Sequence, residues 1–188
     1  MLNINQRNNF LNLVKSRHST RKYRDKPIAK KDLLKCVEAA RLAPSANNSQ
    51  PGRFIIIDDP EVKARLARHA FSGVYAATKW AAKAPAIIVL LAELDLMANK
   101  IGKQITGLNF YLIDTGIAGE HFVLQAQDLG IGTCWIGWFS AKGVKKALYL
   151  PAKYKPVAII AAGYPESPKT KRKKRKPLND IHWFNKLN

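Results

Sequence analysis

The 188-residue sequence contains little cysteine and no apolar run long enough to span a bilayer. Its two cysteines, Cys36 and Cys134, are too few for a disulfide framework or a metal site. Both lie among apolar residues, so we expect buried free thiols. No signal peptide is visible after Met1. We therefore expect a cytoplasmic protein without a membrane partner. We also expect a single domain over residues 1–188, because this length suits one hydrophobic core.

Acidic residues are scarce as well, since 13 Asp and Glu stand against 32 Lys and Arg, for a net charge of +19. Residues 169–176 hold seven of these cations, yet the rest of the chain is basic without them. A basic surface favours anionic partners such as phosphorylated cofactors or nucleic acid. The sequence has no helix-turn-helix or RNA-recognition signature, and aromatic residues do not alternate with the basic run. Nucleic-acid binding is therefore kept only as the lesser alternative.

The familiar signatures of side-chain catalysis are absent too. The sequence has no nucleophile-elbow pattern, no glycine-rich phosphate loop and no metal-ligand spacing. Its four histidines are scattered at His18, His69, His121 and His182. We therefore predict no metal site and no catalytic side chain. The residues present suit the binding of a flat phosphorylated cofactor better than direct chemistry by the protein.

Apolar periodicity predicts a helix-rich chain with four short buried strands. Helices are expected at 6–16, 31–42, 61–70, 73–83, 106–129 and 141–148, and strands at 54–57, 86–91, 132–139 and 156–162. Segment 93–103 has no clear pattern and is expected to be a loop or short helix. This order indicates an α+β or α/β fold with one sheet covered by helices on both sides.

Two further features carry structural predictions. Gly116 and Gly119 lie inside the longest expected helix, where glycine is unfavourable, so we expect another helix or a flat ligand to approach closely there. Near the C-terminus, Ile181, Trp183 and Phe184 form an apolar cluster that can dock onto the body of the protein. Such docking would make residues 169–188 part of the fold.

Two segments are candidates for binding. Arg17 and Arg21 stand four residues apart with the Ser19 hydroxyl between them, and forked guanidinium groups bind phosphate oxygens in pairs. Alone, such a basic segment also fits a solvated surface. Residues 44–51 form a loop with a proline at each end and only amide, hydroxyl and alanine side chains between. This loop could read a polar heterocycle, although ordinary loops are polar as well.

Four segments together resemble the FMN-dependent nitroreductase family. They are Arg17-His18-Ser19-Thr20-Arg21, residues 43–51 (Ala-Pro-Ser-Ala-Asn-Asn-Ser-Gln-Pro), residues 128–137 and the basic residues 173–178. They follow the family's order and cover nearly the whole chain. The resemblance implies an α+β sandwich with a central mixed, mainly antiparallel sheet flanked by helices. It also implies an intertwined homodimer with FMN at the interface and the long helix in the dimer core.

The resemblance also implies which residues bind the cofactor. The phosphate would be held by Arg17 and Ser19 and closed over by Lys173 and Arg175, and His18 would also belong to the cofactor site. Arg21 would lie at the pyrimidine edge of the flavin ring, where a cation stabilises negative charge at N1 and O2. The ring would be lined by Pro44, Ser45, Asn48, Gln50, Trp135, Ile136 and Gly137, with Asn48 and Gln50 from the opposite subunit.

The implied activity is that of an FMN-dependent NAD(P)H oxidoreductase. NADH or NADPH would reduce FMN at N5 and leave, and a nitroaromatic, quinone or similar small acceptor would then take its place in a ping-pong cycle. Residues 93–107 leave little room for a covering insertion, and Gly52 stands where the family often has tryptophan, so we expect an open site. Reductive dehalogenation and flavin destruction by the same family remain alternatives.

Overall fold

The sheet at the centre of the protein has four strands in the order β1-β2-β4-β3, with every neighbouring pair antiparallel. The computed structural model describes residues 4–94, 107–167 and 174–187. The strands are β1 (Gly52–Ile57), β2 (Ala86–Glu93), β3 (Gly132–Ile136) and β4 (Tyr154–Gly163). All four expected strands are present, although the segment 132–139, expected as a strand that runs into a glycine turn, is strand only as far as Ile136. Segment 93–103 lies almost wholly outside the described residues.

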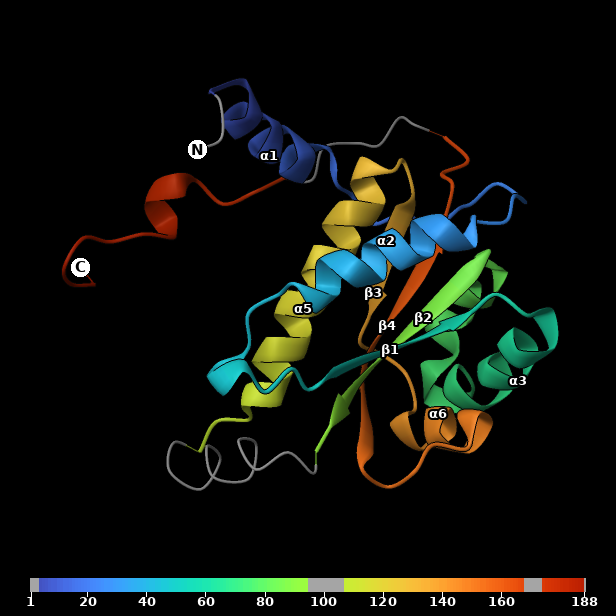
Figure 1. Ribbon diagram of the computed structural model, residues 1–188. Helices are drawn as coiled ribbons and strands as arrows, with labels where there is room; N and C mark the ends of the chain where they lie inside the picture. The colour runs from blue at the N-terminus through green and yellow to red at the C-terminus, as the bar shows by residue number, and fades with distance from the viewer. Residues whose placement is uncertain (1–3, 95–106, 168–173, 188) are drawn as a thin grey trace.

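Helices cover both faces of this sheet (Figure 1). On one face lie α2 (Lys30–Arg41) and α5 (Phe110–Asp128), and on the other α3 (Pro60–Ala70), η2 (Gly73–Lys83) and α6 (Ala141–Leu148). In β2, Ile87 and Val89 face the second group, whereas Ile88 and Leu90 face the first. Burial on both sides explains why β2 is apolar without alternation. The α+β fold predicted from the sequence is confirmed.

Local signals correctly placed several helix ends. The Asp59 carboxyl accepts a hydrogen bond from the Val62 amide at 2.9 Å, with a proline next to it at the first helical position. Ser140 caps α6 in the same way through the Gly143 amide at 3.0 Å. Gly130 follows α5 with a φ of +72°, the left-handed conformation typical of a helix end. In the described part of the chain, no helix is long and apolar enough to cross a membrane.

The long helix α5 is shorter than the predicted 106–129. It begins at Phe110, after Gly107 takes a φ of +71°. The prediction of close approach at both glycines holds only at Gly119. A Cβ there would collide with the Trp135 ring and the Leu90 side chain, whereas one at Gly116 would meet nothing within 4 Å. The neighbour at Gly119 is therefore an indole of the same chain, not a second helix or a ligand.

Both ends of the chain extend away from this body (Figure 1). The N-terminal helix α1 (Ile4–Ser16) leaves Phe10 58% exposed. The C-terminal tail contains the short η3 (Leu178–Asp180), and Phe184 in it is 83% exposed. Ile181 and Trp183 are also exposed. The expected docking of this cluster is thus not found within one copy of the chain.

Candidate functional site

The basic segment Arg17–Arg21 lies against the edge strand β3. The Thr20 amide donates a hydrogen bond to the Thr133 carbonyl at 2.9 Å, and Ser19 and Thr133 form a parallel bridge. The four described strands pair only antiparallel, so the predicted mixed pairing is confirmed in its antiparallel part, and the parallel contact is this isolated bridge. It also brings together two of the segments that the sequence marked as candidates.

Tyr23 holds this segment in place, and the sequence alone did not identify it. Its hydroxyl donates to the Thr20 carbonyl at 2.5 Å and lies 3.2 Å from the carbonyl of Ala161 in β4. Burial raises the pKa of Tyr23 far above its usual value, so the phenol keeps its proton and remains a donor. Gly163 leaves room for the Tyr23 ring, because a Cβ there would collide with it.

The phosphate-binding candidates divide into free and engaged side chains. His18 is engaged, since Nδ1 donates to the Ser16 carbonyl at 3.3 Å and Nε2 lies 3.1 Å from the Thr20 hydroxyl. The half-buried Arg17 forms no side-chain hydrogen bond or ion pair with any other residue that the structure describes. Its guanidinium group, with Ser19 two residues on, is therefore available to an anionic ligand.

Arg21 has a partner on the neighbouring helix. Its guanidinium carbon lies 5.8 Å from the centre of the Trp80 ring in η2, a cation–π arrangement. Trp80 was not among the residues predicted for the site. The same helix is tied to the end of β3, because the Thr78 hydroxyl donates to the Trp138 carbonyl at 2.9 Å and the Trp138 indole donates to the Val74 carbonyl at 2.8 Å.

The three predicted ring-lining residues at and just after the end of β3 differ in what they offer a ligand. The Trp135 indole packs on Gly119 and donates to the Glu120 carboxyl at 3.2 Å, so it faces α5. Ile136 is buried against the other helical layer. Gly137 is exposed, and nothing lies within 4 Å of the place where its Cβ would be. Open space for a planar ligand therefore begins at Gly137.

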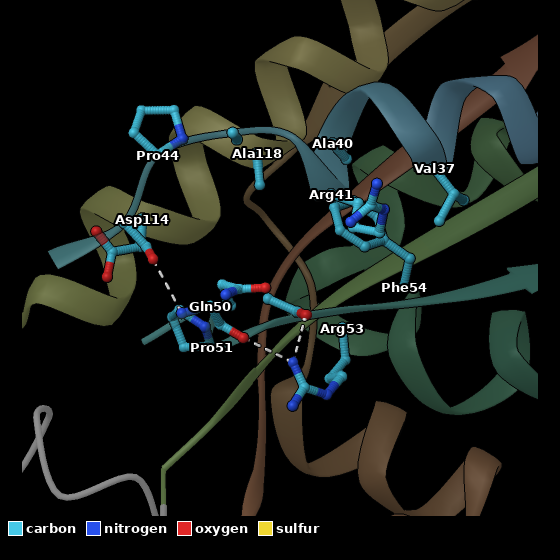
Figure 2. Close-up of a pocket in the computed structure, with 13 residues that line it drawn as sticks. Val37, Ala40, Arg41, Pro44, Gln50, Pro51, Arg53, Phe54, Asp114 and Ala118 are labelled. Atoms are coloured by element: carbon cyan, nitrogen blue, oxygen red, sulfur yellow. Dashed lines mark hydrogen bonds between the residues drawn. The ribbon is translucent and has the colours of Figure 1, made fainter. Parts of the chain in front are cut away.

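The loop 44–51 has a specific conformation rather than that of a generic polar loop. Asn47, Asn48 and Gln50 have φ values of +50°, +50° and +46°, which explains the abundance of asparagine, a residue that tolerates this region. The Ser45 hydroxyl accepts a hydrogen bond from the Gln50 amide at 2.9 Å (Figure 2). The side chains of Gln50 and Asn48 are joined at 3.0 Å. Both are exposed, as is Pro44.

Behind this loop lies a cavity of about 240 Å³ between α2, β1 and α5 (Figure 2). Its walls are largely apolar, and its lining includes Val37, Pro44, Phe54, Asp114 and Ala118. The loop itself is attached to α5 by a hydrogen bond from the Ala46 amide to the Asp114 carboxyl at 3.1 Å.

Within one copy, the candidate residues form two groups at opposite ends of α5. The loop 44–51 contacts α5 at Asp114, near its start. The segment that begins at Arg17 follows Ser16, whose hydroxyl accepts from Gln127 near the end of α5 at 3.2 Å. Thirteen residues of helix separate these two contacts, or roughly 20 Å. The structure therefore joins Arg17–Arg21 with β3, at Thr133 four residues before Gly137, but does not bring the loop to this group.

The C-terminal candidates stand apart from both groups. Lys173 lies outside the described residues. Arg175 lies in the exposed tail, with no hydrogen bond or ion pair to the rest of the described chain.

Both predicted buried free thiols are confirmed at Cys36 and Cys134. Burial raises the pKa of the Cys36 thiol to about 12.

A sequence model of the nitroreductase family matches residues 14–164, which is most of the chain. The chain belongs to the nitroreductase family. It is 32% identical to a nitroreductase family protein of Clostridium difficile 630, with a TM-score of 0.79 over 95% of this chain and 99% of that one. An FMN-dependent nitroreductase of Clostridium difficile R20291 has a TM-score of 0.76 at 28% identity, over 94% and 99% of the two chains.

A Staphylococcus aureus (strain USA300) protein named NADPH-dependent oxidoreductase is 28% identical over 93% of this chain and 72% of its own length. These relatives confirm the family resemblance and the prediction that this nitroreductase family member is an oxidoreductase. Lys173 and Arg175 lie beyond the matched residues.

Proposed function

We propose that this protein is an FMN-dependent NAD(P)H oxidoreductase that reduces nitroaromatic, quinone or similar small acceptors, with each site built from two copies of the chain. The observation that carries this proposal is the separation of the two groups of candidate residues along α5. A second copy could place its loop 44–51 beside the first copy's Arg17–Arg21 and Gly137. The names of the FMN-dependent and NADPH-dependent relatives support the cofactor and the electron donor.

The residues beside and just after β3 fit a phosphorylated planar cofactor. Arg17 and Ser19 would bind the phosphate, because the guanidinium is free of other charged partners that the structure describes. Arg175 and Lys173 would approach the same phosphate from the tail. The exposed backbone at Gly137 would accommodate the ring.

The chemistry needs little from the protein beyond binding and electrostatics. When bound, FMN supplies hydride exchange at N5, first with NADH or NADPH and then with the acceptor, in a ping-pong cycle. Arg21 would bring positive charge to the pyrimidine edge, where negative charge develops, and the Trp80 ring would keep its guanidinium group in place. The loop 44–51 would supply amide and hydroxyl groups to the polar edge of the ring.

Exposed apolar side chains support the proposed homodimer. Leu112 and Ile113 on α5 are 42% and 51% exposed, and large exposed apolar areas mark interaction sites. The two projecting ends of the chain add more apolar surface, at Phe10, Leu11, Val14, Leu178, Ile181, Trp183, Phe184 and Leu187. A partner subunit would cover these side chains.

Anaerobic stopped-flow absorbance tests the proposed activity directly. The protein is loaded with FMN and mixed with NADH or NADPH, and an acceptor is then added from a panel of nitroaromatics and quinones. We expect loss of the flavin absorbance band with at least one nicotinamide and its return with an acceptor. Failure to bind FMN, or a bound flavin that neither nicotinamide reduces, would refute the proposal.

The phosphate assignment has its own test. Replacing Arg17 by Ala should weaken FMN binding by roughly 1.5–3 kcal/mol, the usual contribution of hydrogen bonds to charged groups. Arg21→Ala should shift the flavin reduction potential more than it weakens binding. Isothermal titration and spectroelectrochemistry separate these two effects. Unchanged FMN affinity in Arg17→Ala would show that the phosphate lies elsewhere.

A further inference from the structure

The loop 44–51 meets the body of the protein at a buried carboxyl group on α5. Asp114 is only 5% exposed, and its Oδ1 atom accepts a hydrogen bond from the Ala46 amide at 3.1 Å. This contact joins residues 68 positions apart. Asp114 was not a candidate from the sequence, because an acidic residue within a predicted helix has no local signal for such a role.

Several other hydrogen bonds of the loop are internal, but its C-terminal end is also bonded to the sheet. There the Pro51 carbonyl accepts from the Glu93 amide at 2.9 Å, and the Gln50 carbonyl accepts from the Arg53 guanidinium at 2.7 Å. The Asn48 amide donates to the Ser45 carbonyl at 3.0 Å, and the Ser45 hydroxyl accepts from the Gln50 amide. These bonds give the loop its shape, including the left-handed conformations of Asn47 and Asn48. The internal bonds do not determine where the loop lies relative to α5, and the bonds to Arg53 and Glu93 hold only the end of the loop next to β1. Within the described residues, the hydrogen bond to Asp114 is the one that joins the loop backbone to α5.

The second oxygen of Asp114 makes this residue costly for folding. Its Oδ2 atom is buried and has no hydrogen-bond partner among the residues that the structure describes. A buried polar atom without a partner destabilises the folded state. Asparagine would retain an acceptor for the Ala46 amide, but its side-chain N–H donors would then be unpaired in place of Oδ2. Among the described residues, the buried carboxyl thus makes a single hydrogen bond, the one to the loop.

We propose that Asp114 is a positioning residue that holds the loop 44–51 where it can contact the flavin ring. The proposal rests on the FMN-dependent function proposed above. Asp114 acts through the Ala46 amide and does not itself need to touch the cofactor. Loss of this hydrogen bond should therefore release the loop and weaken FMN binding while the sheet and the helices remain folded.

Two substitutions remove the same hydrogen bond from opposite sides. Asp114→Ala removes the acceptor. Ala46→Pro removes the donor without changing the core, and it should be tolerated because Ala46 is the first residue of η1 (Ala46–Asn48) and Ser45 before it is extended. Asp114→Asn keeps the acceptor. Asp128→Ala is the matched control, since Asp128 is an exposed aspartate on the same helix.

Hydrogen exchange at the loop amides and FMN titration are measured on each variant, with thermal unfolding to verify the fold. We expect Asp114→Ala and Ala46→Pro each to accelerate exchange at Asn48 and Ser49 and to weaken FMN binding by about tenfold. The double variant should be no weaker than either single one, because both remove one interaction. Asp114→Asn should bind FMN within about threefold of the parent, because it keeps an acceptor for the Ala46 amide.

The outcomes separate this proposal from the proposed function. If the parent protein binds no FMN, the function fails, while exchange at the loop amides still decides whether Asp114 anchors the loop. If the parent binds FMN but Asp114→Ala and Ala46→Pro leave both affinity and exchange unchanged, Asp114 is not a positioning residue. Loss of affinity in Asp114→Asn equal to that in Asp114→Ala would also overturn the proposal.

Discussion

The two helical layers that cover the sheet differ sharply in charge. The layer of α3, η2 and α6 carries eight Lys or Arg residues and one acidic residue, Glu61. None of these eight forms an ion pair within the described ranges. In the other layer, α5 carries three acidic residues and no Lys or Arg, and two cations of α2, Lys35 and Arg41, are paired on the helix surface.

Exposed apolar side chains are distributed in the opposite way to positive charge. We call the layer of α3, η2 and α6 the basic layer and that of α2 and α5 the apolar layer. The α2 and α5 layer leaves Leu34, Leu112 and Ile113 exposed. In the three helices of the basic layer that the structure describes, Val74 is the exposed large apolar residue. Like charges repel, so the basic layer is poorly suited to pack against a copy of itself. The comparison supports the homodimer proposed above, in which α2 and α5 would meet the partner subunit while the basic layer would stay in water and attract anionic substrates.

The largest effect should come from placing a charge on the apolar layer. Ile113→Glu on α5 should give a monomer that binds FMN at least tenfold more weakly, because a buried unpaired charge is costly and the site needs two copies. Val74→Glu is the matched control on the basic layer, and it should remain dimeric and yellow. Light scattering with absorbance detection measures both properties. A monomeric Ile113→Glu protein with full FMN affinity would show that one copy suffices.

Mixed dimers test the division of the site between two copies. Arg17→Ala and Asp114→Ala should each impair both sites of their own homodimer. A heterodimer of the two variants has one site with an intact Arg17 and an intact loop, provided that the loop acts on the partner's cofactor. Tagged heterodimers should therefore recover about half of the parent's tight FMN sites by titration. If the loop served its own chain, the heterodimer would contain no intact site.

A smaller effect should appear at high pH through Cys36, which is buried in the apolar layer. Burial raises its pKa to about 12 in the folded protein, above the usual value for an unfolded chain. The folded state therefore holds the proton more tightly, so the stability from this group is complete below about pH 8.5 and declines as pH rises toward 12. Unfolding by urea should show that the free energy of unfolding falls by about 2 kcal/mol between pH 8 and 10.

The control for this prediction is Cys36→Ala. This variant should be less stable than the parent at pH 8, but its free energy of unfolding should fall less as the pH rises. Burial also raises the pKa of Tyr23, so ionisation of Tyr23 likewise lowers the free energy of unfolding as pH rises. An unfolded tyrosine titrates near pH 10, however, so this contribution falls mainly above pH 10. A decline between pH 8 and 10 that is equal in both proteins would exclude Cys36 as its source.

The smallest effect should be electrostatic. Lys142→Glu with Lys146→Glu on the basic layer should slow the bimolecular reaction with NADPH roughly twofold to fivefold at low salt, because the surface charge attracts the anionic donor. The difference should vanish near 0.5 M salt, where screening is strong. Lys30→Glu with Lys31→Glu on α2 makes the same change of charge on the other layer and should have less effect. Equal effects of the two pairs would contradict the comparison.

Features encoded over a few residues were predictable. The apolar run in β2, the proline after Asp59 and the Ser140 cap each depend on neighbours within one turn or one strand. The start of α5 was predicted four residues early, because Leu108 continues the apolar period although Gly107 adopts a left-handed conformation. The role of Tyr23 was not predictable, since its hydroxyl meets the Ala161 carbonyl 138 positions away.

The segment Arg17–Arg21 illustrates both what the sequence determines and what the tertiary structure decides. Its residue types alone specify a group able to bind phosphate, because the chemistry of guanidinium and hydroxyl groups does not depend on the fold. Its place against β3, the Trp80 ring over which Arg21 lies, and the distance of the loop 44–51 along α5 depend on contacts between residues far apart in the chain. Such contacts arise only when the helices pack on the sheet. The sequence by itself therefore determined the family, the strands and the candidate residues, and the tertiary structure decided which of them meet in one copy.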